Sequence, residues 1–161
     1  MTGKIGLLDE AFDHLTLGSA AIYEAVLQGF SLNPCRAPLQ LAVGGLRRAG
    51  HLEFLALGLL TRASLRSIIG ARIGPESAQA DLDEAWEIAE RGPMPLFLAN
   101  IHLHRARLFH AVIPYPWPTD SAGNLSGPKD DLAAARHLIE KHGYWRRKEE
   151  LEDAEAAAKT W

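Results

Sequence analysis

The chain of 161 residues is long enough for one domain with a substantial core, and its 47% hydrophobic and 23% charged residues are ordinary for a globular protein. A formal net charge of -3 argues against nucleic-acid binding, for which a basic excess is expected. No stretch approaches the 18 or so uncharged apolar residues of a transmembrane helix, and no charge pattern favours a membrane surface.

Cys35 is the single cysteine, which excludes an intrachain disulfide and a cysteine-based zinc cluster. A single thiol suits a reducing compartment. The N-terminal segment has acidic residues early and no continuous apolar core, so it does not resemble a signal peptide. These features predict a cytoplasmic protein.

Hydrophobic periodicity and helix-stop signals predict an all-α chain with seven helices, in chain order near residues 8–28, 34–49, 51–70, 75–91, 94–112, 128–142 and 146–158. We expect Gly50, Gly92 and Gly143 to end helices in the left-handed conformation that glycine adopts easily. Prolines suit the first turn of the following helices, at Pro34, Pro75 and Pro128.

Apolar residues recur at an interval of 43 along this series of helices. In the first helix of each pair the recurring positions are Leu17, Ala20 and Ile22; Leu60, Ala63 and Leu65; and Leu103, Ala106 and Leu108. In the second helix they are Cys35, Leu39 and Ala42; Ala78, Leu82 and Ala85; and, after a seven-residue insertion, Pro128, Leu132 and Ala135. Such self-similarity predicts a helical-repeat architecture.

The small residues in this pattern let two helices approach closely. We expect Ala20, Ala63 and Ala106 to lie where the first helix of each pair meets the second. Because one helix pair cannot bury its apolar face alone, the pairs 8–49, 51–91 and 94–142 are expected to stack as an α-α superhelix. Residues 146–158 would cap the stack, docked through Tyr144 and Trp145.

Leu60-x2-Ala63, followed by Ala78-x3-Leu82-x2-Ala85, resembles the tetratricopeptide motif. The segments ADLDEAWEIAERG, ANIHLHRARL and ARHLIEKHGYWRRKEEL are similar to the C-terminal arrays of large bacterial signalling ATPases and transcriptional regulators. The 43-residue period exceeds the usual 34 of the family. In addition, this chain has Leu and Ala where the tetratricopeptide motif has a large aromatic residue and a glycine.

The resemblance implies one repeat domain over residues 1–161. Its expected function is non-catalytic, the binding of a peptide or partner protein on the concave face. The alternative is a structural, sensing or oligomerisation segment of a larger bacterial signalling protein.

The resemblance also assigns groove positions to the first helix of each pair: His14, Gly18, Ala21 and Ala25; Leu57, Thr61, Ser64 and Ile68; and Asn100, His104, Arg107 and Ala111. The candidate contacts for a partner are Thr61, Ser64, Asn100, His104 and Arg107. Asn100 and Arg107, two turns apart, could hold a peptide backbone or carboxylate. An intrachain salt bridge of Arg107 is an equal alternative.

Catalytic and metal motifs are missing from the sequence. His102 and His104 would point to different sides of a helix and form no zinc-binding HxxxH pair, so we expect no metal. A hydrogen-bonded packing role suits His102 better. There is no phosphate-binding glycine loop and no GxSxG turn. Asp81, Asp83 and Glu84 are expected on a solvated helix face. The sequence therefore predicts no enzyme and no cofactor.

Two further surfaces are open to interpretation. In the proline-rich insertion, Tyr115 and Trp117 either fold back onto the helices or contact a partner, and folding back is favoured. The first helix pair lacks an evident cap and carries an apolar edge formed by Ile5, Leu7, Leu8 and Phe12. Such an edge predicts packing against upstream repeats or a second copy of the chain.

Overall fold

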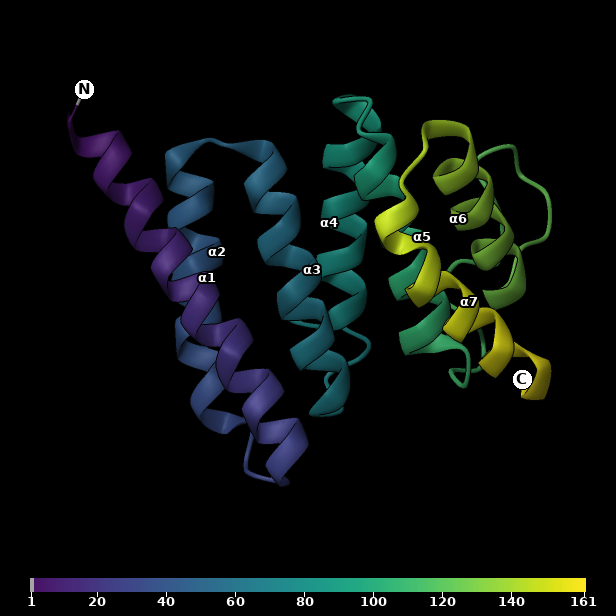
Figure 1. Ribbon diagram of the computed structural model, residues 1–161, viewed down its shortest axis with the longest axis horizontal. Helices are drawn as coiled ribbons and strands as arrows, with labels where there is room; N and C mark the ends of the chain where they lie inside the picture. Colours follow the sequence, from purple (N-terminus) through teal and green to yellow (C-terminus); the bar gives the residue numbers. More distant parts are fainter. Residues whose placement is uncertain (1) are drawn as a thin grey trace. The chain divides into compact units, whose positions relative to one another are not determined.

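The computed structural model describes residues 2–161, with side chains described from residue 6 onward. The described residues form helices joined by turns and loops and contain no strand, only an isolated bridge between Thr119 and Leu125, so the all-α prediction is confirmed (Figure 1). The main helices are α1 (Thr2–Gln28), α2 (Arg36–Ala49), α3 (Leu52–Ile68), α4 (Ala78–Arg91), α5 (Pro95–Phe109), α6 (Pro128–His142) and α7 (Lys148–Ala157). Short 3-10 turns are η1 (Asn33–Cys35), η2 (Trp145–Arg147) and η3 (Ala158–Thr160).

The chain divides into two compact units, Met1–Ile88 and Ala89–Trp161, and the division falls within α4. A single repeat domain over the whole chain stays a prediction. None of the described helices combines the length and apolar character needed to cross a lipid bilayer.

In the first unit, α1 packs along α2 through a narrow stripe of small and apolar residues. The buried positions of α1 alternate in steps of four and three, the spacing that keeps side chains on one helix face: Ala11, Leu15, Gly18, Ile22 and Ala25. A Cβ on Gly18 would lie 2.6 Å from Leu39 Cδ2, and one on Gly45 would lie 2.8 Å from Ala11 Cβ. The two helix backbones therefore approach closely at glycine.

This stripe corrects the predicted register of the first repeat. Ala20 and Leu17 are exposed, so the prediction that Ala20 lies at the contact with the second helix is wrong. Gly18, which we assigned to the groove, occupies that contact instead. In the other pairs Ala63 and Ala106 are completely buried, as predicted. The second-helix residues Leu39, Leu82 and Leu132 are buried as well.

Helix α3 packs on α2 at another glycine, Gly58, where a Cβ would lie 2.9 Å from Leu46 Cδ1. Helix α4 is joined to α3 by hydrogen bonds between Arg62 and Asp81. Ser77 caps the start of α4, since its hydroxyl oxygen accepts a hydrogen bond from the backbone N–H of Ala80.

The predicted helix ends are only partly confirmed. Gly50 and Gly143 end α2 and α6 with φ of 77° and 70°, in the left-handed region. Gly92 has no such positive φ. Helix α4 does end at Arg91, directly before Gly92, as predicted, but the ring of Pro93 pushes Gly92 toward extended conformations, so the left-handed conformation predicted for Gly92 is wrong. Pro128 opens α6, where the Asp130 carboxylate accepts a hydrogen bond from Gly127 N–H.

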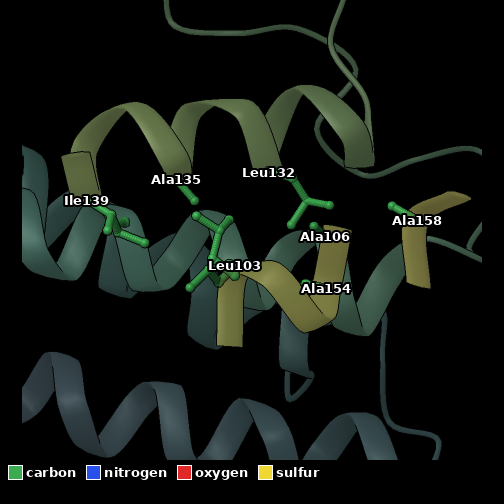
Figure 2. Close-up of a cluster of buried hydrophobic side chains, with 9 residues drawn as sticks. Leu103, Ala106, Leu132, Ala135, Ile139, Ala154 and Ala158 are labelled. Carbon is green, nitrogen blue, oxygen red and sulfur yellow. The ribbon is translucent and has the colours of Figure 1, made fainter. Parts of the chain in front are cut away.

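In the second unit, α5, α6 and α7 enclose one apolar cluster (Figure 2). The cluster combines leucine and isoleucine with alanine from all three helices and from the turn that follows α7: Ala99, Leu103, Ala106, Leu132, Ala135, Ile139, Leu151, Ala154 and Ala158. Tyr144 packs against it, as predicted. Trp145 is 60% exposed, so its predicted docking role is wrong.

Candidate functional site

After its first turn, in which Leu52 and Glu53 are exposed, helix α3 is buried on most of its surface and exposes one narrow stripe. The stripe consists of Leu57, Thr61, Ser64 and Ile68, whose spacing of four, three and four residues keeps them on one side of the helix. Leu57 is 37% and Ile68 50% exposed, while Thr61 and Ser64 are half-buried. The structure therefore leaves all four predicted groove residues of the second repeat accessible. We call this set the α3 stripe.

The two hydroxyl groups of the α3 stripe are engaged by their own helix. Thr61 Oγ1 donates a hydrogen bond to the Leu57 carbonyl oxygen and Ser64 Oγ to that of Leu60, each at 3.1 Å. The donor hydrogen of each hydroxyl is therefore already engaged within the helix, which weakens its capacity to bind a polar partner. With a leucine and an isoleucine at its two ends, the α3 stripe is consequently a largely apolar surface.

The predicted contacts on α5 differ from one another in accessibility. Asn100 is only 5% exposed, so its side chain presents little surface to a partner. His104 is half-buried, and its Nδ1 lies 2.7 Å from the carbonyl oxygen of Asn100. Arg107 is exposed, and no ion pair joins it to any side chain that the structure describes. The intrachain salt bridge that we weighed for Arg107 is therefore not formed within that part of the chain.

The environment of His104 disfavours its charged form. Burial lowers the pKa of His104 below its usual value, opposed by the hydrogen bond to the Asn100 carbonyl. The positive charge of Arg107 lowers the pKa further. Glu150 and Arg147, which flank the start of α7, act in opposite directions. His104 is thus a neutral group at physiological pH, which suits a packing role beside Arg107.

A buried ionic network between α3 and α4 was not predicted. Asp81 is 1% exposed, so the prediction of a solvated helix face is wrong for this residue. Its carboxylate accepts hydrogen bonds from Arg62 Nη2 at 2.6 Å and Nε at 3.1 Å, and from Arg66 Nη1 at 2.9 Å. Gln40 Oε1 accepts another from Arg62 Nη1 at 2.9 Å. One carboxylate therefore compensates two guanidinium groups.

The repeat interval carries a signal for this network. Arg62 and Asp81 correspond, at intervals of 43 and 50 residues, to Arg105 and Asp131 of the next pair. All four side chains are buried in the structure. A basic and an acidic residue that recur at these intervals would have distinguished Asp81 from Asp83 and Glu84, which are less buried.

In the second unit, Asp131 holds two aromatic side chains. His102 Nδ1 lies 2.6 Å from Asp131 Oδ1, and the Tyr115 hydroxyl donates a short hydrogen bond to Oδ2. His102 is therefore a hydrogen-bonded packing histidine, as predicted. Burial raises the pKa of the Tyr115 phenol, and the negative charge of Asp131 raises it further. The Tyr115 hydroxyl consequently keeps its proton and donates the hydrogen bond to Asp131 at physiological pH.

Trp117 also folds back onto the second unit. Its ring packs edge-on against Phe109, with ring centres 4.9 Å apart, and the Arg105 guanidinium lies 4.6 Å from the Trp117 ring centre. The favoured prediction for Tyr115 and Trp117 is confirmed. Both side chains attach the insertion to the helices.

The apolar edge predicted on the first pair is largely covered. Leu7, Leu8 and Phe12 are half-buried, and the rings of Phe12 and Phe54 lie 4.7 Å apart. The side chain of Ile5 lies outside the described residues. The exposed apolar side chains of α1 lie elsewhere, at Leu17, Tyr23, Val26 and Leu27.

Among the residues that the structure describes, no group of three or more histidine, cysteine, aspartate or glutamate side chains could hold a metal ion. Comparison of the chain with family models, with characterised proteins and with solved structures gives no match.

Proposed function

We propose that the chain is a non-catalytic helical-repeat module of tetratricopeptide type that binds a peptide or a helix of a partner protein, with the α3 stripe as its principal contact. The recurrence of apolar positions at 43 residues supports the repeat, and the helix pairs would continue one another as a superhelix. The observation that carries the binding proposal is the α3 stripe itself. Beyond its first turn, α3 is largely buried except for this one line of four accessible residues.

The chemistry of the α3 stripe indicates the kind of partner. Its hydroxyl groups are bonded internally, so polar recognition there is weak and apolar contact with Leu57 and Ile68 dominates. The side chain that fits such a stripe is a leucine, isoleucine or phenylalanine of an amphipathic segment. On α5, the exposed Arg107 is a second contact, suited to a carboxylate.

A random peptide library displayed on phage, selected against the full chain, tests this proposal. The selected peptides are expected to carry apolar residues at helical spacing. Ile68→Glu should weaken their binding about tenfold or more, because it places a charge on the apolar contact. Leu52→Glu is the matched control, since Leu52 lies at the start of the same helix, faces away from the α3 stripe and is also 50% exposed. Equal affinity of the two variants would refute the proposal.

Arg107 is tested separately with the same peptides. Arg107→Glu should weaken those that carry carboxylates and leave uncharged peptides unaffected, because the substitution reverses a charge without changing the apolar surface. Loss of uncharged peptides as well would indicate that the variant disturbs the fold of the second unit.

A further inference from the structure

The α3 stripe is lower in its middle than at its two ends. Its four side chains follow one another at steps of four, three and four residues, which at about 100° per residue place them within a sector of about 60° of the helix surface. Leu57 and Ile68 at the ends are large and exposed, whereas Thr61 and Ser64 between them are smaller and half-buried. A flat partner surface would therefore touch the ends of the stripe and leave its middle unfilled.

A carboxylate extends the α3 stripe at the N-terminal end of the helix. Glu53 is the acidic residue in the first turn of α3 and precedes Leu57 by four residues, so it lies on the same side of the helix. Its side chain is exposed, and no ion pair joins it to any side chain in the described part of the chain. The surface offered to a partner is consequently apolar with one negative end.

We propose that the element bound on the α3 stripe is an antiparallel α-helix of the partner, with one large apolar side chain seated on Thr61 and Ser64. This inference rests on the proposed function and specifies the occupant of its principal contact. Steps of four and three residues form the seam along which two helices pack lengthwise, crossing at about 20°. From Leu57 to Ile68 the seam is about 16 Å long, which a partner helix covers in three turns.

The relief of the α3 stripe determines which residues the partner helix carries. A large side chain at the centre of that helix fills the lower middle of the stripe. Alanine-sized residues one turn before and one turn after it leave room for Leu57 and Ile68, so that large residues of each helix face small residues of the other. The expected partner sequence therefore has a phenylalanine, leucine or methionine flanked on both sides, at three or four residues, by small residues.

The charge at the end of the α3 stripe determines the direction of the partner helix. A lysine or arginine that pairs with Glu53 lies about three turns from the central residue of the partner. Basic side chains are stabilised by the helix dipole near the C-terminus of their own helix. When the two helices run antiparallel, the C-terminal turn of the partner lies beside the first turn of α3, so one basic residue there satisfies both the dipole and Glu53. Such an exposed charge pair mainly selects orientation and partner.

Titration of the full chain with a synthetic helical peptide of about 20 residues tests the shape. The peptide carries phenylalanine at its centre, alanine one turn away on both sides, leucine a further turn out, and lysine near its C-terminus. Ser64→Leu, which fills the lower middle of the stripe, should weaken its binding about tenfold or more. The same variant should bind more tightly than the wild type when alanine replaces the phenylalanine of the peptide.

Ser64→Ala is the matched control for bulk. It removes the hydroxyl group without filling the middle of the stripe, so both affinities should stay within about twofold of the wild type. Tighter binding of the phenylalanine peptide by Ser64→Leu would overturn the inference. So would failure of the wild type to bind this peptide while it binds peptides selected on phage and loses them in Ile68→Glu. That second result would leave the proposed function intact.

Charge reversal and a spin label test the direction. Glu53→Lys should weaken binding of the lysine peptide about threefold or more, and should strengthen binding when glutamate replaces the lysine. Glu149→Lys, in the first turn of α7, changes the net charge equally and is the matched control. A nitroxide at the C-terminus of the peptide should broaden the amide signals around Glu53. Broadening around Ile68 instead, or equal effects of the two variants, would overturn the antiparallel arrangement.

Discussion

The guanidinium of Arg62 donates two hydrogen bonds to the carboxylate of Asp81, Nη2 to Oδ1 and Nε to Oδ2, with both side chains withdrawn from solvent. Because α3 provides the arginine and α4 the aspartate, this pair ties one helix to the next inside the first unit. Arg66 shares the same carboxylate. Removing the negative charge would leave the buried Arg62 and the partly buried Arg66 without the carboxylate that they share.

We therefore expect Asp81→Asn to lower the free energy of unfolding by about 3–5 kcal/mol, the typical effect of removing one partner from a buried ion pair. Urea unfolding followed by circular dichroism measures the change. Asp153→Asn, which alters an exposed acid on α7, should change stability by about 0.5 kcal/mol or less. Similar losses in the two variants would contradict the structural role of Asp81.

Two adjacent glycines of α2 should respond in opposite directions to alanine. At Gly44 a Cβ would have Arg48 Nη1 at 3.5 Å as its nearest neighbour, so Gly44→Ala should stabilise the protein by up to about 1 kcal/mol through helix propensity. At Gly45 a Cβ would lie 2.8 Å from Ala11 Cβ. Gly45→Ala should therefore destabilise by about 1–3 kcal/mol, because α1 must move away. Thermal unfolding measures the change in stability of both variants. Stabilisation by both substitutions would contradict the close approach of α1 and α2.

Tyr115 should make stability sensitive to alkaline pH. Its pKa is raised in the folded protein, so above about pH 10 the unfolded chain loses a proton that the folded one keeps, and stability falls as pH rises. Tyr115→Phe should lower stability by about 1.5–3 kcal/mol at pH 8, where the bond to Asp131 is intact. Between pH 8 and pH 10.5 the variant should lose less stability than the wild type. If the stability of Tyr115→Phe and of the wild type falls equally with pH, the hydrogen bond between Tyr115 and Asp131 is contradicted. Tyr23→Phe, which removes an exposed hydroxyl, serves as the control.

His104 should affect stability on the acid side. Because its pKa is lowered in the folded protein, the unfolded chain takes up a proton first as pH falls through about 6.5. The stability that neutral His104 contributes is therefore present above that pH and lost below it. The free energy of unfolding, measured with urea, should decrease less between pH 7 and pH 5 in His104→Gln than in the wild type. His137→Gln, on the exposed face of α6, should not have this effect. If the free energy of unfolding of His104→Gln decreases as much as that of the wild type, groups other than His104 cause the decrease.

The helices could be predicted because their signals are local. Apolar periodicity, Gly50 and Gly143 at helix ends, and Pro128 at a helix start act within one or two turns, and the structure has a helix wherever these signals fall. The burial of Ala63 and Ala106 followed from the repeat, since a small residue is selected where two helices meet.

The remaining features depend on partners distant in sequence. Asp81 resembles any first-turn acid until α3 places Arg62 against it, so the sequence alone predicted it on a solvated helix face. In α1 the interval of 43 residues favoured Ala20, but the four-and-three pattern through Ala11 and Gly18 determines which face meets α2. That pattern could be recognised in the sequence. The burial of the Asn100 side chain could not be predicted, because it depends on how the elements around α5 pack.

The most direct test of the proposed function is to map a selected peptide onto the isotope-labelled full chain by NMR. Amide signals from Leu57 to Ile68 should shift most strongly, and Ile68→Glu should abolish these shifts while Leu52→Glu should not. Shifts confined to other helices, with the α3 signals unchanged at saturating peptide, would show that the α3 stripe is not the binding surface.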